Sequence, residues 1–474
     1  MKKRYRILFY NWVQFDDKDG TGGGVTVYVR NLIEAIVTFR SDVEIFFLSS
    51  GWAYDKGKDY CYVRQTKNIF GSRCKTYEIV NSPVPAFQKF VLKNISATFE
   101  SKALNKCLED FLENMGQFDI IHFHNIEGLS LDCFEQFFAH ARKTFYSMHN
   151  YIPICPTGFY FNRTENKICV PSHTGAQCTE CAKKVCIREP FKGIVQRTES
   201  SARKFLLRAK LCKEYSGNWG ENIGLKNLVN ECKAEDYQLY TQKTKDVIMQ
   251  MDKILAVSNK VKDIAVENGI PEEKIIVSYI GTKVADLAKK YQGKALIKPD
   301  ENLHLIFLGA YLANYEKGYP FLIQALKALP ENCKKSIELT LTVKDKNKDE
   351  WLKNELGAFS SIRIIHGYTH RTLKRILRNQ DLGIVPVMWE DNLPQIAIEM
   401  QSYGVPVLSS SYGGASELCQ NPLFIYEGGN LDDLKNHIIH FVTNKKDLEQ
   451  FWLNNKPPVT MQEHLKQLES IYGI

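Results

Sequence analysis

Residues 389–400 read WEDNLPQIAIEM and place two adjacent acids, Glu390 and Asp391, before a proline and a third acid, Glu399, after it. The buried strand DLGIVPV precedes them, and Pro394 takes a favoured first-turn position in a helix that stops at Gly404. Glu399 then falls in the second helical turn, where its carboxylate can accept hydrogen bonds from ligand hydroxyls. The spacing predicts that these residues bind a ligand beyond the carboxyl end of the strand.

The next strand, VPVLSSS, leads to Gly413 and Gly414, which open a second predicted helix at ASEL. Two helix N-termini then face one crevice. Because helix N-termini attract anions, this arrangement suits a doubly charged leaving group.

Two further loops follow predicted strands and precede helices. Gly22, Gly23 and Gly24 allow either a close backbone approach to a phosphate or only a tight turn, and they lack the spacing of a dinucleotide fingerprint. Lys317 and Gly318 stand before the helix YPFLIQALKAL, where the ammonium either holds a diphosphate or is solvated surface.

Two domains are needed to position these loops. Continuous apolar strands alternate with helices in two series, from RILFYNW to KILAVS and from LHLIFLGA to VPVLSSS, which predicts two doubly wound parallel-sheet domains of the α/β class. We expect an N-terminal domain over 1–295, with a Cys-rich insert near 150–190, and a C-terminal domain over 296–455. A final amphipathic helix is expected within 456–474, with Leu465, Leu468 and Ile471 on its apolar face.

Composition indicates a globular protein, with 24% charged and 44% hydrophobic residues and no apolar run near the roughly 18 residues of a membrane-spanning helix. The N-terminus predicts a strand and not a signal peptide, so we expect a cytoplasmic protein. From Lys183 to Lys213 there are ten Lys or Arg against two Glu. This stretch fits either a helix on the inner face of a membrane or a solvated helix, and it lacks a motif for nucleic acid.

The 13 cysteines do not suggest a secreted disulfide scaffold. Cys155, Cys169, Cys178 and Cys181 have the spacing C-x13-C-x8-C-x2-C, and Cys186 is nearby. Four thiolates can close a tetrahedron around a structural zinc ion. An iron–sulfur cluster, a redox disulfide or unliganded thiols are the alternatives.

The order of these motifs resembles the family 4 glycosyltransferases of the GT-B fold, in which two domains face across a cleft. The resemblance covers residues 5–420 and rests on the glycine-rich first loop, the strand ending in His149, the K-G loop, an acid-x7-acid motif, G-V-P-V and G-G-x-x-E. It implies a retaining hexosyl transfer from a nucleoside diphosphate sugar to a glycan or a lipid-linked saccharide, and no catalytic metal. It also implies that the N-terminal domain is on the acceptor side, that the C-terminal domain binds the nucleotide-sugar, and that the last helix returns to the first domain.

The resemblance also implies roles for single residues. Glu399 would hold ribose hydroxyls, Asp391 would contact the sugar, His149 would lie near the anomeric carbon, and Lys317 would neutralise the diphosphate. Donor-binding roles fall on Gly23, Gly24, Asn392, Leu393, Pro394, Gly413 and Gly414. Glu390 is one residue out of register, which makes it either a loop-surface charge or a support for the site.

The chain departs from the family pattern in two places. Asp391 stands where Glu is usual, and the basic residue that often follows Gly309 is Ala310. These departures favour the alternative of a noncatalytic nucleotide- or glycan-binding scaffold with a degenerate site.

Overall fold

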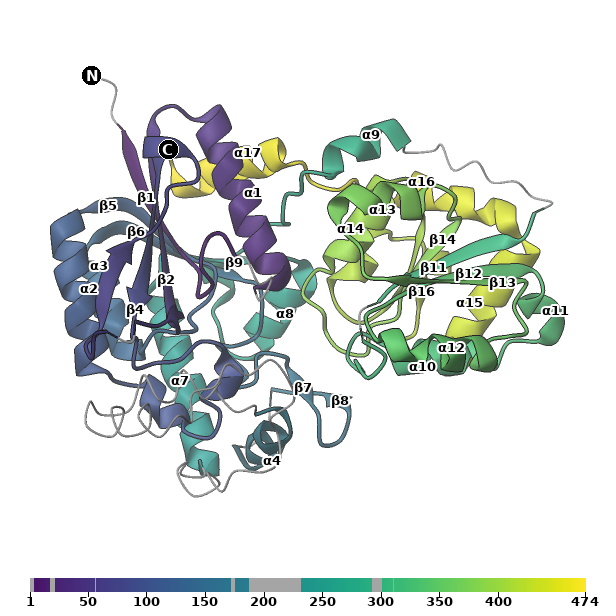
Figure 1. Cartoon of the computed structure of the whole chain (residues 1–474), viewed down its shortest axis with the longest axis horizontal. Coiled ribbons are helices and arrows are strands. Elements are labelled where there is room, and N and C mark those ends of the chain that lie inside the picture. Colours follow the sequence, from purple (N-terminus) through teal and green to yellow (C-terminus); the bar gives the residue numbers. More distant parts are fainter. Residues whose placement is uncertain are drawn as a thin grey trace. The chain divides into compact units, whose positions relative to one another are not determined.

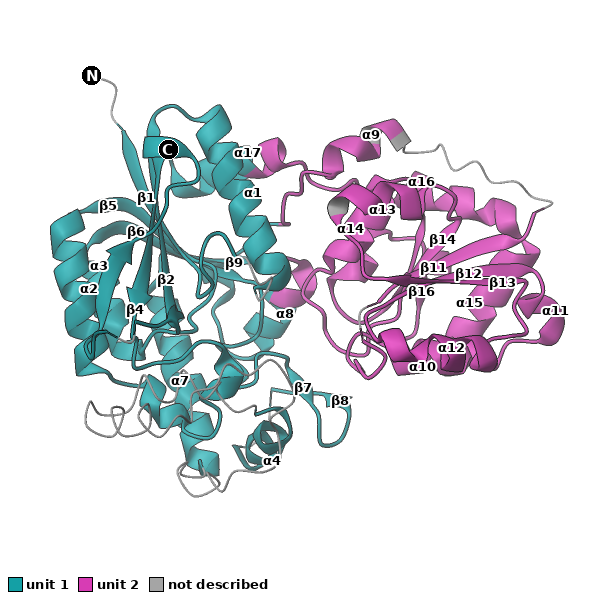
Figure 2. Cartoon of the chain, viewed as in Figure 1, with its two compact units in different colours: residues 1–256, 262–278, 465–474 teal, residues 257–261, 279–464 magenta. Residues whose placement is uncertain are grey.

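The computed structural model describes residues 4–17, 22–55, 57–171, 175–186, 232–291, 301–309 and 311–474. These form two compact units (Figure 2). Unit 1 contains residues 1–256, 262–278 and 465–474, and unit 2 contains residues 257–261 and 279–464. The chain thus leaves unit 1 at 278/279, where the sequence suggested 295/296, and returns to it at 464/465, inside the last helix.

Unit 1 is built around one sheet, which has eight strands within the described residues, in the order β10-β9-β6-β5-β1-β2-β4-β3. All pairs are parallel except β3 with β4. The central strands are buried almost without interruption, as the apolar runs predict. The strands are β1 (Tyr5–Tyr10), β2 (Val43–Ala53), β3 (Tyr62–Gln65), β4 (Cys74–Val80), β5 (Phe118–Phe123), β6 (Ala141–Met148), β9 (Lys253–Ala256) and β10 (Ile275–Val277).

Helices cover both faces of this sheet, with α2 and α3 on one side and α1 and α17 on the other (Figure 1). A small hairpin, β7 (Phe161–Asn162) and β8 (Lys167–Ile168), lies in the Cys-rich insert beside α4. The helices are α1 (Gly23–Phe39), α2 (Lys102–Met115), α3 (Phe134–Ala139), α4 (Gly175–Val185), α7 (Ala234–Gln250), α8 (Asn259–Glu267) and α17 (Met461–Tyr472), the last two running across the unit boundary.

The final helix, α17, buries Leu465 and Leu468 as its pattern predicts, but Ile471 is only half-buried and Tyr472 is buried in its place. The Tyr472 hydroxyl lies 2.6 Å from Nδ1 of His122 on β5. A step of four residues from Leu468 keeps Tyr472 on the inner face of the helix.

Unit 2 contains a sheet that is parallel throughout, with six strands among the described residues in the order β13-β12-β11-β14-β15-β16. Helices α10 and α12 lie on one face, and α13 and α14 on the other (Figure 1). The strands are β11 (Leu303–Leu308), β12 (Ile337–Val343), β13 (Ser361–His366), β14 (Leu382–Val385), β15 (Val407–Ser410) and β16 (Ile425–Tyr426), and the helices are α9 (Ala288–Tyr291), α10 (Tyr319–Lys327), α11 (Glu331–Lys334), α12 (Asp349–Glu355), α13 (His370–Leu377), α14 (Gln395–Ser402), α15 (Leu431–Thr443) and α16 (Phe451–Asn454).

The two sheets confirm the predicted α/β class with two doubly wound, parallel-sheet domains. Strand β3 departs from the parallel pattern as an antiparallel edge. No helix within the described residues is long and apolar enough to cross a membrane. Most of the basic stretch 183–213 lies outside the described residues.

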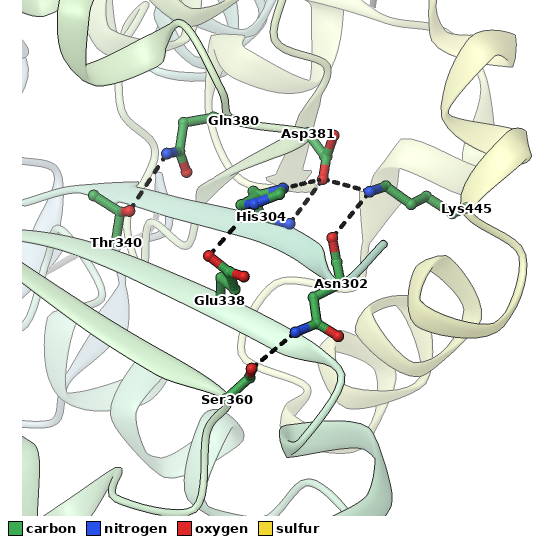
Figure 3. Close-up of polar contacts among 8 residues, drawn as sticks. All are labelled: Asn302, His304, Glu338, Thr340, Ser360, Gln380, Asp381 and Lys445. Carbon is green, nitrogen blue, oxygen red and sulfur yellow. Dashed lines mark hydrogen bonds and ion pairs between the residues drawn. The ribbon is translucent and has the colours of Figure 1, made fainter. Parts of the chain in front are cut away.

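A polar cluster joins the starting ends of β11, β12 and β14 in unit 2 (Figure 3). Lys445, which follows α15, donates to Asp381 Oδ2 at 2.8 Å and to the Asn302 carbonyl at 3.0 Å. The same Asp381 oxygen accepts from the backbone N–H of His304 at 2.8 Å. We call Asn302, His304, Asp381 and Lys445 the amino-edge cluster.

Candidate functional site

The candidate site in unit 2 lies at the opposite edge of the sheet, beyond the carboxyl ends of β11, β14 and β15. Ligands of doubly wound folds bind at this edge. Three loops meet there: residues 309–318 (of which residue 310 is not described), 386–394 and 411–414. We call them the donor loops.

The first donor loop is held against the second by backbone contacts. Gly318 has a φ of +76°, and a Cβ atom there would stand 1.6 Å from the carbonyl oxygen of Pro386. Only glycine fits such a close approach. The Met388 N–H also donates to the Glu316 carbonyl at 2.9 Å. Lys317 is thereby fixed at the start of α10.

The structure brings Lys317 and Asp391 together, although they are distant in sequence. The Lys317 ammonium lies 2.5 Å from Asp391 Oδ2, and it also stands over the ring of Trp389 at 5.2 Å. The lysine side chain is 44% exposed and the aspartate side chain 9%. An ammonium has three donors, so Lys317 can keep this ion pair and still donate to an anion.

Glu390 is buried, so the option of a loop-surface charge is wrong. Its Oε2 accepts a hydrogen bond of 2.6 Å from the Gly413 N–H, and its Oε1 lies 3.9 Å from Lys260. Burial raises the pKa of Tyr412, and the negative charge of Glu390 raises it further. Glu390 therefore fastens the second donor loop to the third.

The glycines of the third donor loop are required by close packing. Gly413 has a φ of +74°, and a Cβ atom there would stand 2.3 Å from the carbonyl oxygen of Asp391. The Gly414 N–H donates to that same oxygen at 2.8 Å. Gly414 begins a short 3₁₀ turn, Gly414–Leu418, where the sequence predicted a helix.

Asn392 offers both a fixed and an unused polar group. Its carbonyl accepts from the Ser258 hydroxyl at 2.7 Å. Its side-chain Nδ2 is buried, and it has no hydrogen-bond partner within the described part of the chain. Such a donor is costly unless a ligand or water meets it. Leu393 and Pro394 are buried beside it.

Helix α14 begins at Gln395, so Pro394 is its N-cap and not its first helical residue. The prediction was off by one position, because Pro394 has an extended ψ of 116°. Glu399 lies in the second turn, as predicted, and is 6% exposed. Burial raises the pKa of Tyr368, and the negative charge of Glu399 raises it further. The two side chains are therefore close enough to interact.

The glycine loop of unit 1 forms the start of α1. Gly22 is the N-cap, and its N–H donates to Asp17 Oδ2 at 3.0 Å. Gly23 has a φ of +57°, and no atom lies within 4 Å of a Cβ built there. Gly24 follows in the first turn. Residues 18–21 of this loop lie outside the described residues, so the choice between a phosphate-binding loop and a tight turn stays a prediction.

His149 follows β6, as predicted, and it contacts a second histidine that the sequence did not single out. Its Nε2 lies 3.2 Å from His124 Nδ1, and its ring centroid lies 5.1 Å from that of Tyr28. His124 follows β5 directly in FDIIHFHN. The alternation of His with buried residues at a strand end was the available signal.

Glu127 is a second residue that sequence reasoning missed. It is buried beyond the end of β5, and its Oε1 accepts from the Gln88 N–H at 2.7 Å. Burial raises the pKa of Glu127 to about 7, so this carboxyl changes protonation state near neutral pH. Perturbed carboxyls of this kind gather at functional sites, which makes Glu127 a candidate on the unit 1 side.

The four predicted metal-binding cysteines all lie in the insert between β6 and α7. Cys155 and Cys181 are buried, and Cys169 and Cys178 are half-buried. Within the described residues, no group of three or more His, Cys, Asp or Glu side chains is arranged to hold a metal ion. The structural zinc therefore stays a prediction.

Comparison with known proteins gives a family match for the segment that carries the donor loops. Residues 289–456 match the family described as "Glycosyl transferases group 1". The matched segment includes all three donor loops.

Two curated relatives are 26% identical to this chain. One is an uncharacterized 41.2 kDa protein in the cps region of Klebsiella pneumoniae, aligned over 219 residues, which are 44% of this chain and 58% of the relative. The other is the uncharacterized glycosyltransferase MJ1607 of Methanocaldococcus jannaschii, aligned over 168 residues, 33% of this chain and 42% of the relative. The chain thus spans about half of the length of these relatives.

Solved structures match along the whole chain. Sucrose-phosphate synthase from Thermosynechococcus elongatus has a TM-score of 0.59 at 13% identity, covering 99% of this chain and 98% of that one. Anabaena HepE in complex with UDP-glucose has a TM-score of 0.53 at 12% identity, covering 99% and 100%. At these identities the likeness establishes the GT-B fold.

Proposed function

We propose that this protein is a retaining glycosyltransferase of the hexosyltransferase type that uses a nucleoside diphosphate sugar. The observation that carries the proposal is the composition of the donor loops. They hold an exposed ammonium on Lys317 and the unused amide donor of Asn392, and the helix that follows the second loop, α14, carries the buried carboxylate of Glu399. The solved relative HepE, which shares the fold, was crystallised with UDP-glucose.

Each group has a role in this proposal. The Glu399 carboxylate accepts hydrogen bonds from the ribose hydroxyls, and Asp391 accepts from a sugar hydroxyl while it orients Lys317. Lys317 and the N-terminus of α14 offset the charge that develops on the departing diphosphate. Preorganised donors at such a position commonly contribute a rate factor of about 10²–10³.

On the acceptor side, the proposal assigns His149 to the neighbourhood of the anomeric carbon and Gly23 and Gly24 to the diphosphate. The departing phosphate oxygen takes the proton of the acceptor hydroxyl, so no protein nucleophile and no catalytic metal are needed. The acceptor is a glycan or a lipid-linked saccharide. We place the enzyme in the cytoplasm, at the inner face of the membrane when the acceptor is lipid-linked.

The test is turnover of a panel of UDP-, GDP- and ADP-sugars by the wild type and by Glu399→Gln. We expect hydrolysis or transfer with at least one donor, and loss of turnover in the variant because the ribose hydroxyls lose a charged acceptor. NMR of the first product reports retention, and inversion would contradict the proposed mechanism. Lys353→Ala, at an exposed position on α12, is the control for surface substitution.

The second candidate is a noncatalytic binding scaffold, which the shorter Asp391 side chain and its ion pair with Lys317 favour. Nucleotide binding without turnover of any donor in the panel would support the scaffold. Asp391→Glu is the matched variant, since it restores the longer acid. Appearance of turnover only in that variant would identify a degenerate site.

A further inference from the structure

The acid of the G-G-x-x-E motif, Glu417, has no role in the sugar transfer proposed above. It is half-buried, in the 3₁₀ turn Gly414–Leu418 that follows the third donor loop. We propose that Glu417 is a positioning residue, which holds residues 257–261 against the donor loops and thereby fixes the backbone of Asn392. The inference rests on the proposed function, because the Asn392 amide is one of the groups that carry it.

The Glu417 carboxylate binds the start of α8, in residues that belong to unit 2. Its Oε1 accepts from the Lys260 N–H at 2.8 Å, and its Oε2 accepts from the Asn259 N–H at 3.0 Å. The same Oε2 accepts from the Asn259 side-chain amide at 3.0 Å. The first N–H groups of a helix have no partner within the helix, and they carry partial positive charge. A carboxylate therefore binds them more strongly than a neutral side chain would.

A second segment of unit 2 meets the same carboxylate. The Tyr279 hydroxyl donates to Glu417 Oε2, and it accepts from the Asn259 amide at 2.7 Å. The Lys456 ammonium stands over the Tyr279 ring, 3.3 Å from its centroid. Burial raises the pKa of Tyr279, and its hydrogen bond to Glu417 raises it further, so the hydroxyl keeps its proton and stays a donor. Glu417 thus joins Tyr279 to the first turn of α8.

Ser258 connects this turn to the second donor loop. Its buried hydroxyl accepts from the Val261 N–H at 3.2 Å, as the residue that caps a helix does. The same hydroxyl donates to the Asn392 carbonyl at 2.7 Å. The position of the first turn of α8 therefore determines where the Asn392 backbone is held.

Gly414 closes these contacts into a ring. A Cβ atom at Gly414 would stand 2.4 Å from the Asn392 carbonyl oxygen and 2.8 Å from Ser258 Cβ, so only glycine fits between them. Gly414 lies in the same 3₁₀ turn as Glu417. The contacts run from Glu417 to α8, from Ser258 to Asn392, and back through Gly414.

Asn392 is the residue through which this ring affects a ligand. Its carbonyl is bound by Ser258, while its buried side-chain Nδ2 has no hydrogen-bond partner within the described residues. A bound donor sugar can use this Nδ2 only if the backbone behind it stays in place, because a displacement of about 1 Å can lower a rate about 10²-fold. Glu417 therefore acts on the ligand indirectly, by holding Asn392.

The test compares Glu417→Ala with the wild type in steady-state kinetics, using the best substrate in the panel of UDP-, GDP- and ADP-sugars. We expect kcat/KM to fall about tenfold, because a displaced Asn392 amide no longer meets the donor. Glu417→Gln keeps the length of the side chain and one acceptor oxygen, so it should recover part of the loss. Glu417→Asp keeps the charge but is one methylene shorter, so it should recover less.

A double-mutant cycle separates positioning from a general loss of stability. Asn392→Ala removes the side-chain amide and leaves the carbonyl that Ser258 binds. In that background Glu417→Ala should lower kcat/KM less than about threefold, against about tenfold in the wild type, because residues that act through one another are not additive. Equal effects of Glu417→Ala in the two backgrounds would overturn the proposal. Where Glu417→Ala fails to fold, Ser258→Ala removes only the connecting hydroxyl and should show the same coupling to Asn392→Ala.

The matched control is Asp132→Ala in unit 1, which removes a carboxylate that accepts from the Ser101 N–H at 3.2 Å and from the Asn105 amide at 3.2 Å. It should lower the free energy of unfolding and leave kcat/KM unchanged. An equal loss of kcat/KM in this control and in Glu417→Ala would also overturn the proposal.

Failure of the proposed function gives a different result. A wild type that binds a sugar nucleotide without turnover overturns the transferase and not the role of Glu417, which the same cycle then tests on the Kd of that sugar nucleotide, measured by calorimetry. A wild type that binds no member of the panel overturns both.

Discussion

The two edges of the unit 2 sheet both carry polar side chains, but they use them differently. At the amino edge, Lys445 is 5% exposed and meets the Asp381 carboxylate and a backbone carbonyl (Figure 3). At the carboxyl edge, Lys317 is 44% exposed and donates one hydrogen bond to Asp391. The side-chain Nδ2 of Asn392 has no hydrogen-bond partner within the described residues. The polar groups of the amino-edge cluster bind one another and stabilise the fold, whereas some polar groups of the donor loops are available to bind a ligand.

The largest effect should come from removing the cation of the amino-edge cluster. Lys445→Ala leaves the Asp381 carboxylate buried without its ammonium, and breaking a buried pair in this way costs about 3–5 kcal/mol. Urea unfolding monitored for unit 2 measures it. The control is Lys435→Ala, which removes an exposed pair with Asp432 on α15 and should cost at most about 1 kcal/mol. An equal loss of unfolding free energy in the two variants would contradict the structural role that we assign to the amino edge.

Removing the cation of the donor loops should instead affect turnover. Lys317→Ala should lower the rate of sugar transfer about 10²–10³-fold, because the departing diphosphate loses a preorganised positive charge. Its urea midpoint should fall by less than that of Lys445→Ala, because Lys317 is 44% exposed, so water can replace its ammonium beside Asp391. Initial rates at saturating donor measure the first effect. A loss of stability as large as that of Lys445→Ala would mean that both edges are structural.

Glu390 lies between these extremes, because it positions a donor loop without contacting a ligand. Glu390→Ala should raise the KM for the donor about tenfold, since the Gly413 N–H loses its charged acceptor. Glu390→Gln keeps an acceptor oxygen and should recover most of the loss. Steady-state kinetics that separate KM from kcat measure this. An unchanged KM in Glu390→Ala would show that the third donor loop holds its position alone.

The smallest effect is expected at the periphery of the amino-edge cluster. The Glu338 carboxylate lies 3.4 Å from His304 Nε2 and its side chain is 42% exposed, so Glu338→Gln should cost less than about 1 kcal/mol. Urea unfolding at low and high salt checks this, and salt should reduce the difference. A large, salt-independent cost would extend the buried cluster to Glu338.

The sheet architecture could be predicted from the sequence because its central strands are continuous apolar runs such as FDIIHFHN. The edge strands could not be predicted in this way. Strand β3 is half exposed and polar, and β16 has only two residues, so neither produces a clear pattern. Tertiary context decided these elements.

For the candidate site, the sequence indicated which loops face the ligand edge but not how they are joined. The pairing of Lys317 with Asp391 spans 74 positions, and no local pattern encodes it. The burial of Glu390 depends on the turn at Gly413, which a sequence of residue types does not specify. Loop position follows from strand order, whereas loop contacts follow from packing.

The return of α17 to unit 1 has a consequence for the chain as a whole. The Ser278 hydroxyl lies 3.2 Å from Gln467 Oε1, so the points where the chain leaves and re-enters unit 1 are neighbours. Apart from residues 257–261, unit 2 is in effect a domain inserted between two adjacent points of its host. Replacing residues 279–464 by a short flexible linker should therefore leave a continuous host chain, which can be produced and titrated with its own ligands without unit 2.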